Sequence, residues 1–121
     1  MPHLSLEYSA NLLEKAHLVD LLKKCNSLLA EYLPTDINSC VSRTIECDQY
    51  YIGEGQSNKA FIHISLKVKS GRTFATLQKT SEALLAVTKE YCLESYRQLN
   101  LKISVDIVEL QNNYFSVTEV S

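Results

Sequence analysis

The sequence has little of what membrane-spanning or nucleic-acid-binding proteins need. It contains no apolar stretch near the ~20 residues of a membrane span, and it does not begin with a basic segment followed by an unbroken apolar run. Its formal net charge of −2 and its pI near 5.9 provide no broad basic field for a nucleic-acid backbone. We therefore expect a soluble, cytoplasmic protein that binds neither nucleic acid nor membrane.

The cysteine and glycine patterns argue against two further kinds of site. The four cysteines are too few and too irregularly spaced for a disulfide framework or a zinc module, so we expect reduced, mostly buried thiols. They are Cys25, Cys40, Cys47 and Cys92. The Gly-x-Gly at Gly53–Gly55 has no following glycine and opens no helix, which predicts a turn rather than a phosphate-binding loop. No cofactor or metal is expected.

What the chain does contain is a regular succession of amphipathic segments. Its 121 residues fit one domain, 1–121, that is large enough to bury a core. Alternating apolar and polar residues predict strands at 3–8, 40–52, 61–68 and 101–107, with 114–117 as a short further candidate. Apolar spacings of three and four predict one helix from Leu12 to before Pro34 and another after Thr73. Asn11, with Glu14 as capping-box partner, and Thr73 are the expected N-caps.

The chain also repeats itself at an offset of 60 residues, from His3 to His63. His3-Leu4-Ser5-Leu6 matches His63-Ile64-Ser65-Leu66, and the same offset relates Arg43-Thr44-Ile45 to Ile103-Ser104-Val105. Strand, helix and strand thus occur twice, in units of about 1–60 and 61–121. This predicts an α/β (α+β) fold in which two βαβ repeats form a four-stranded mixed sheet with both helices on one face.

The sheet face opposite the helices is predicted to be polar. It would carry His3, Ser5, Glu7, His63, Ser65 and Lys67. Such a face is either solvated or forms the wall of an oligomer. The two histidines are expected to be hydrogen-bonded strand residues rather than metal ligands, because no Asp, Glu or Cys lies at ligand spacing on a shared element.

Pro2, directly behind Met1, is the candidate catalytic residue. Once Met1 is removed, its nitrogen is a secondary amine, which can act as a general base if its surroundings lower its pKa toward the working pH. If Met1 remains, this nitrogen is a tertiary amide without basicity. The alternative is that Pro2 merely begins an edge strand, where a missing N–H costs nothing.

Three features together resemble the 5-carboxymethyl-2-hydroxymuconate delta-isomerases of the tautomerase superfamily. They are the repeat, the start Met1-Pro2-His3 with Glu7-Tyr8-Ser9, and Phe61–Lys67 leading into Ser70-Gly71-Arg72-Thr73. The resemblance implies a tautomerase-like homotrimer of aromatic catabolism, with active sites near subunit interfaces and no cofactor. It implies that Pro2 acts as general base and then general acid, and so moves a proton in an enol or dienol carboxylate. The enzyme would be a keto–enol tautomerase of the intramolecular oxidoreductase type. Arg72 would bind a substrate carboxylate.

One position departs from the pattern of that family. Relatives read Ile-Arg-Ser-Arg where this chain has Cys40-Val41-Ser42-Arg43, so Val41 replaces the first arginine and Arg43 remains as the weaker substrate-binding candidate. A lost carboxylate contact should weaken a tricarboxylate more than a monocarboxylate. We therefore predict activity on phenylpyruvate-like or muconate-like enols and poor activity on the tricarboxylate of the homoprotocatechuate pathway.

Two other interpretations of the sequence stay open. The first is a non-catalytic tautomerase-fold trimer that acts as a binding or structural module. The second is a ferredoxin-like regulatory domain, since βαββαβ is also the element order of that fold. The repeat, the starting proline and Arg72 favour the tautomerase interpretation.

Overall fold

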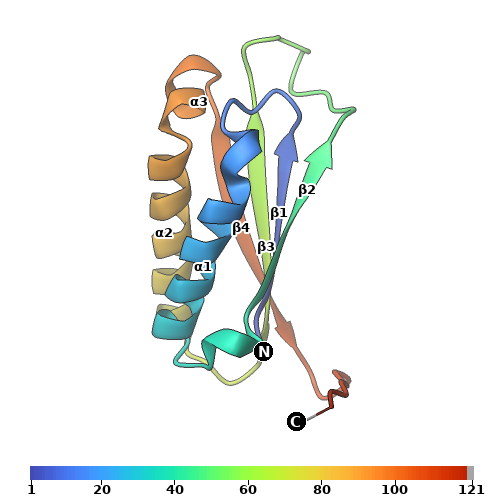
Figure 1. The fold of residues 1–121 in the computed structure, drawn as a ribbon, viewed down its shortest axis with the longest axis vertical. Helices are drawn as coiled ribbons and strands as arrows, with labels where there is room; N and C mark the ends of the chain where they lie inside the picture. Colours follow the sequence, from blue (N-terminus) through green and yellow to red (C-terminus); the bar gives the residue numbers. More distant parts are fainter. Residues whose placement is uncertain (120–121) are drawn as a thin grey trace.

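The computed structural model describes residues 1–119. In it, the chain forms one sheet that is covered by helices on one face (Figure 1). The first repeat contributes β1 (His3–Ser9), η1 (Lys15–His17), α1 (Leu18–Tyr32), η2 (Ile37–Ser39) and β2 (Val41–Cys47). The second contributes β3 (Phe61–Lys69), α2 (Phe74–Tyr91), α3 (Leu93–Gln98) and β4 (Lys102–Leu110). Strand order is β2-β1-β3-β4, parallel within each repeat and antiparallel between β1 and β3. The predicted mixed sheet with two long helices on one face is confirmed.

The core lies between the helices and the two central strands. Every second residue of β1 and β3 is buried there, as the alternation in the sequence predicts. The fully buried residues include Leu4, Leu6, Ile62, Ile64, Leu66 and Val68 from the strands and Leu21, Cys25, Leu29 and Leu84 from the helices. Each large side chain stabilises the fold by about 1.5–3 kcal/mol through burial. In residues 1–119, no helix has the length and apolar character needed to cross a membrane.

The register of β1 and β3 confirms the 60-residue offset of the sequence. Ser5 lies opposite Ser65, and His3 lies opposite Lys67. An antiparallel pair with this register has a local two-fold axis at Ser5 and Ser65, which relates His3 to His63. The side chains at these odd-numbered positions project from the face away from α1 and α2, which we call the open face.

The offset of 60 residues fails for the outer strands. His3 pairs with Val41 in the first repeat, whereas His63 pairs with Ser104 in the second. The structural equivalents Val41 and Ser104 are therefore 63 residues apart in the chain. The offset of 63 residues in the outer strands differs by three from the offset of 60 in the central strands. Because side chains alternate between the faces of a strand, residues matched with the wrong offset point to opposite faces.

The sequence match of Arg43 with Ile103 was therefore wrong. Arg43 pairs with Ser5 on the open face, whereas Ile103 packs against the core beneath the helices. The true counterpart of Arg43 is Asp106, which pairs with Ser65. Equivalent places in the two repeats thus carry a cation and an anion.

The predicted start of the first helix was also wrong. The α1 helix begins at Leu18 after a 3-10 turn, and no side chain caps it. Asn11 instead donates to the Lys59 carbonyl oxygen over 2.8 Å, and the Glu14 carboxylate accepts from the backbone N–H and hydroxyl of Ser95. Contacts with residues far away in the chain therefore outweigh the local capping preference of both residues.

The other predicted boundaries are mostly confirmed. Thr73 caps α2, since its Oγ1 accepts from the Thr76 N–H at 3.2 Å. The second strand is shorter than expected, because β2 ends at Cys47 and the residues after it form a loop. Residues 114–117 form no strand in this structure, so that candidate was wrong.

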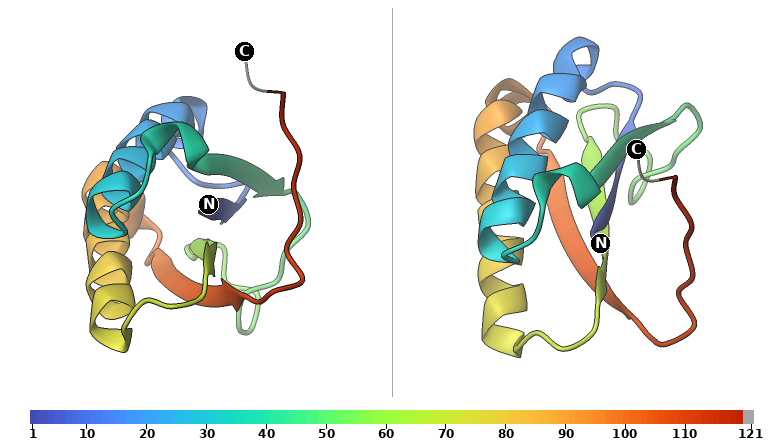
Figure 2. Two further views of the ribbon diagram at one scale, coloured as in Figure 1. Left: turned by 90° about the horizontal axis from the view of Figure 1, so that it is seen from below. Right: turned by 60° about the horizontal axis from the view of Figure 1, so that its bottom comes forward.

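The amino terminus and the segment after β4 meet at one end of the sheet. Figure 2 shows the amino terminus at this end, near the turn between β3 and α2, and the segment after β4 running on the side away from the helices. The Tyr114 hydroxyl lies 3.0 Å from Met1 Sδ, and its ring centroid is 6.4 Å from that of His3. The segment after β4 therefore contacts the first residues of the chain.

Candidate active site

Pro2 lies buried at the start of β1, between two neighbouring strands. Its carbonyl oxygen accepts from the Val41 N–H over 3.0 Å, which ties the start of β1 to β2. On the other side, His3 pairs with Lys67 of β3. Continued by two residues, this antiparallel register places Met1 beside Lys69. Pro2 therefore sits where β2 and β3 flank the chain end.

The surroundings of the chain end disfavour a positive charge on its amine. The pKa of the Met1 amine lies below its ordinary value, first because the amine is partly buried and next because Lys69 and Arg72 are nearby cations, while Cys40 opposes the shift. Arg72 is held in place by backbone carbonyls, with Nη1 donating to Lys69 and Nη2 to Leu33, each at 3.1 Å. An amine at this position is therefore more available as a base than an exposed one.

Arg43 lies on the open face and bonds to the first strand. Its Nη1 donates to Ser5 Oγ at 3.1 Å, and its Nη2 lies 3.2 Å from His3 Nδ1. Because a guanidinium only donates, His3 Nδ1 must be the acceptor and the ring proton must lie on Nε2. The pKa of His3 is lowered by burial, then by Arg43, the amino terminus and Lys67. His3 is thus a hydrogen-bonded strand histidine, as predicted, and its lowered pKa favours the neutral ring.

A pocket of about 290 Å³ opens on the open face beside the chain end. It is lined by His3, Ser5, Arg43, Ser65, Lys67, Leu110 and Tyr114. Within the described chain, the charged residues of this lining are Arg43 and Lys67, which are both cations. Each of the other polar side chains, those of His3, Ser5, Ser65 and Tyr114, can donate a hydrogen bond. This donor set suits an anionic ligand such as a carboxylate.

Comparison with known proteins identifies the family. A family model described as 5-carboxymethyl-2-hydroxymuconate isomerase matches residues 2–119. The chain belongs to the 5-carboxymethyl-2-hydroxymuconate isomerase family. A curated relative, the 5-carboxymethyl-2-hydroxymuconate Delta-isomerase of Escherichia coli, is 31% identical over 110 residues, which cover 91% of this chain and 87% of the relative.

Solved structures agree with the assignment to the 5-carboxymethyl-2-hydroxymuconate isomerase family. The crystal structure of a 5-carboxymethyl-2-hydroxymuconate isomerase from Deinococcus radiodurans R1 is 26% identical and superposes with a TM-score of 0.89, covering 98% of this chain and 90% of its own. A fused 4-OT described as a symmetric trimer shares the fold, with 14% identity, a TM-score of 0.65 and coverage of 88% and 85%. The fold is that of the tautomerase superfamily.

The structure separates the two arginines that the isomerase-family resemblance suggests for substrate binding. Arg43 lines the pocket on the open face, whereas Arg72 lies in the turn before α2, close to the amine. Val41, at the position of the missing family arginine, lies on the open face directly opposite His3. An arginine there would extend from the strand that holds the Pro2 carbonyl.

The sequence reasoning missed Lys69 and Tyr114 as residues of this region. The alternation that predicts Lys67 on the polar face also predicts Lys69 there, two residues further along the strand. The sequence pattern could therefore have indicated Lys69. Tyr114 gave no such signal, because its contact with Met1 depends on how the segment after β4 folds back.

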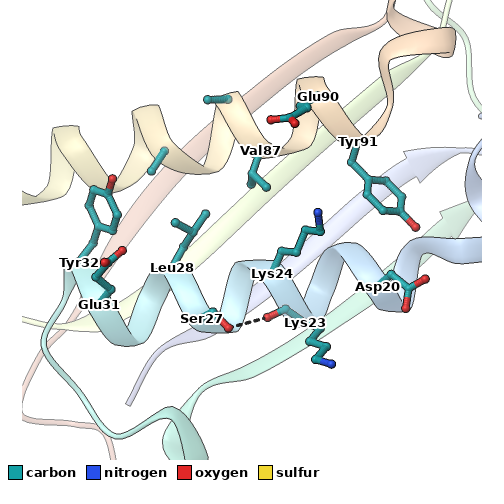
Figure 3. A pocket seen from close by; sticks show the side chains of 12 residues that line it. Asp20, Lys23, Lys24, Ser27, Leu28, Glu31, Tyr32, Val87, Glu90 and Tyr91 are labelled. Atoms are coloured by element: carbon teal, nitrogen blue, oxygen red, sulfur yellow. Dashed lines mark hydrogen bonds between the residues drawn. The ribbon is translucent and has the colours of Figure 1, made fainter.

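A larger hollow of about 1040 Å³ lies on the outer side of α1 and α2 (Figure 3). Its walls carry charges of both signs, with Lys23 and Lys24 beside Asp20, Glu31 and Glu90. It lies on the far side of the helix layer from the open face. Size alone favours this hollow, but the mixed charges leave no preference for an anion, so the chain end remains the candidate site.

Two of the four thiols are excluded as nucleophiles. Cys25, Cys40 and Cys92 are buried and free, and Cys47 is half-buried, which confirms the prediction of mostly buried thiols. Burial raises the pKa of Cys25 and of Cys92 to about 12, so neither forms a thiolate nucleophile near neutral pH. Within residues 1–119, no group of three or more His, Cys, Asp and Glu residues is placed to hold a metal ion.

Proposed function

We propose that this protein, once Met1 is removed, is a cofactor-free keto–enol tautomerase of the intramolecular oxidoreductase type. Its substrate is an enol or dienol carboxylate of the 5-carboxymethyl-2-hydroxymuconate kind, and the Pro2 nitrogen is general base and then general acid. The observation that carries this proposal is the position of the chain end beside Lys69 and Arg72, where the pKa of the Met1 amine is lowered first by partial burial and then by these two cations. Membership of the isomerase family supports the reaction class.

The proton transfer uses one group twice. The unprotonated Pro2 nitrogen takes the enol hydroxyl proton, the C–O bond becomes a carbonyl, and the electron pair moves along the conjugated carbons. The resulting ammonium then returns the same proton to the distant carbon, so atoms and charge balance without an added reactant. Negative charge develops on the substrate between these steps, and nearby cations stabilise it.

Arg72 is proposed to bind a substrate carboxylate at this site. Two of its five N–H donors are used by the carbonyls of Lys69 and Leu33, so the guanidinium keeps free donors while its position is fixed. A carboxylate gains geometric specificity from such a planar donor group. Arg43 is the weaker candidate for a second contact. It also keeps free donors, but Arg72 is the arginine among the cations that lower the pKa of the chain-end amine.

We further propose a homotrimer with active sites near subunit interfaces. The fused 4-OT that shares the fold is described as a symmetric trimer. In this chain, Val41, Ile45 and Val108 are exposed apolar residues on the open face, and Phe115 is 85% exposed. Apolar surface of this kind is what a neighbouring subunit would cover.

The decisive experiment combines intact mass with replacement of the proline. Mass spectrometry should show a chain that lacks Met1. Pro2→Ala should then reduce kcat/KM for phenylpyruvate tautomerisation by about 10²–10⁴-fold, the usual size of a general acid–base contribution. Pro34→Ala, at the other proline of the chain, is the matched control and should keep wild-type activity. Full activity of Pro2→Ala would contradict the mechanism.

The second candidate function is a non-catalytic trimer with the same fold. The residue that favours it is Val41, since the resemblance expects an arginine there. A mature protein that retains Met1, or that turns over neither a monocarboxylic nor a tricarboxylic enol, would exclude the proline mechanism; a trimeric size by ultracentrifugation would then support this alternative.

A further inference from the structure

Lys69 occupies a position at the chain end that the family resemblance does not assign. It is the last residue of β3 and projects from the open face, where the β1–β3 register places it beside Met1. Its backbone carbonyl holds the Arg72 guanidinium at 3.1 Å. The side chain is exposed, and neither of the two ion pairs found in residues 1–119 includes it. Lys69 is therefore a cation without a counter-charge, beside the proposed catalytic amine.

A pocket of about 620 Å³ lies next to this side chain. Lys69 and Ser70 line one side, and residues 110–112 and 114–116 line the other. Lys69 is the charged residue of this lining, and the rest supplies hydroxyl and amide groups together with Leu110 and Phe115. A mostly neutral, partly apolar pocket of this size with one cation suits a small organic carboxylate.

We propose that Lys69 binds a second carboxylate of the substrate in this pocket and supplies the cation that is missing at Val41. The inference rests on the proposed function of Pro2. It follows from the sheet. Val41 pairs with His3 from β2, whereas Lys69 lies on β3 two residues beyond the partner of His3, and close enough to the amine of the chain end to lower its pKa. The second carboxylate contact has thus moved from one neighbour of β1 to the other, and Arg72 remains the first contact.

The exchange of an arginine for a lysine has a chemical consequence. An ammonium is a compact charge on a flexible stem, whereas a guanidinium binds a carboxylate through two parallel hydrogen bonds. The Lys69 contact should therefore accept several polycarboxylates with little preference for one geometry. Affinity should increase with the number of carboxylates, and this increase should depend on Lys69.

The kinetic test uses Lys69→Met, which keeps the length of the side chain and removes its charge. We expect the KM for 5-carboxymethyl-2-hydroxymuconate to rise roughly ten- to hundredfold, the effect of losing one charged hydrogen bond, while the KM for phenylpyruvate changes little. Lys69→Arg should restore the lower KM. Lys102→Met is the matched control, because Lys102 is exposed on the same face at the other end of the sheet. It should behave as wild type.

A second readout separates a charge effect from a structural one. The charged or titratable groups around the amine are Lys69, Arg72, Cys40, His3 and Tyr114. Removing the Lys69 charge should raise the pKa of the Pro2 amine, so the low-pH limb of kcat/KM should move to higher pH. An unchanged limb together with an unchanged KM for the tricarboxylate would overturn the proposal. So would equal losses in Lys69→Met and Lys69→Arg.

Calorimetry makes this inference independent of turnover. Tricarballylate, a non-reactive tricarboxylate, should bind the Pro2→Ala protein, and Lys69→Met in that background should weaken binding by roughly ten- to hundredfold. If Pro2→Ala stays fully active while this loss is seen, the proline mechanism fails and the Lys69 site stands. If tricarballylate does not bind, or binds both proteins equally, the Lys69 site is wrong whatever the role of Pro2.

Discussion

The two copies of the His-x-Ser strand share their sequence but not their electrostatic surroundings. His3 on β1 accepts from Arg43, and the lysine opposite it adds a second cation. His63 on β3 lies 2.8 Å from the Asp106 carboxylate and 2.6 Å from Ser104 Oγ. Each histidine is hydrogen-bonded to the outer strand of its own repeat, but the partner is a cation in one case and an anion in the other.

This difference shows how a repeated fold acquires one site rather than two. Arg43 and Asp106 are structural counterparts on the open face, each at the row of the central serines. The cation belongs to the first repeat, which begins at the amino terminus, and Lys69 and Arg72 of the second repeat add their charges at that end; the acid belongs to the second repeat, which has no amino terminus. Cations therefore gather around the amino terminus, and the proposed amine is found only there.

The largest expected effect comes from blocking the amino-terminal proline amine, which has no counterpart in the second repeat. An alanine inserted between Met1 and Pro2, so that alanine begins the mature chain, converts the proline nitrogen to an amide. We expect kcat/KM for phenylpyruvate to fall by about 10²–10⁴-fold. Alanine added after Ser121 is the control and should leave activity unchanged. Activity that survives the insertion, with the extra residue confirmed by mass, would place the base elsewhere.

A smaller loss is expected from neutralising the arginine beside the chain end. Arg72→Gln removes the charge that is proposed to hold a carboxylate, so the KM for the substrate should rise by the equivalent of about 1.5–3 kcal/mol. Arg97→Gln, on the exposed side of α3, is the matched control. Thermal unfolding should accompany the kinetics, since Arg72 also bonds two backbone carbonyls. An unchanged KM would remove Arg72 from the site.

A gain of function would sharpen the comparison further. Val41→Arg places a third cation opposite His3 and should raise kcat/KM for the tricarboxylate roughly tenfold relative to phenylpyruvate, in line with one modest charged contact. Ile45→Arg adds the same charge on the same strand and face but opposite Glu7, and should give no such gain. Equal gains in both variants would indicate a general charge effect rather than a specific contact.

The smallest expected effect concerns the protonation of His3. Arg43→Gln removes the charged group that lowers the pKa of His3 most, after burial, so this pKa should rise. Asp106→Asn is the counterpart substitution in the second repeat and should leave His3 unchanged, because that carboxylate bonds to His63. Titration of the histidine ring protons by NMR measures both. A pKa of His3 that is the same in the Arg43→Gln protein would show that the two histidines do not differ as described.

Much of the fold could be predicted from local pattern, but not the pairing of the outer strands. Alternation along β1 and β3 predicts which side chains are buried, because both strands have one face under the helices. The match of Arg43 with Ile103 failed because both strands look alike in composition, and only the hydrogen-bonded register shows which residue faces which side. Likewise, the local capping signal at Asn11 and Glu14 was overridden by contacts from residues far away in the chain.

The sequence by itself determined the two βαβ units, the buried faces of the central strands and a proline behind the first methionine, since periodicity and residue order are local properties. Only the tertiary structure decided what surrounds that proline. Lys69 and Arg72 reach the chain end because β1 and β3 are antiparallel, and Tyr114 reaches it because the segment after β4 folds back. Groups separated by many residues act on one amine only when the sheet brings them together. Partial burial, and next the charges of Lys69 and Arg72, lower the pKa of the Met1 amine at this position.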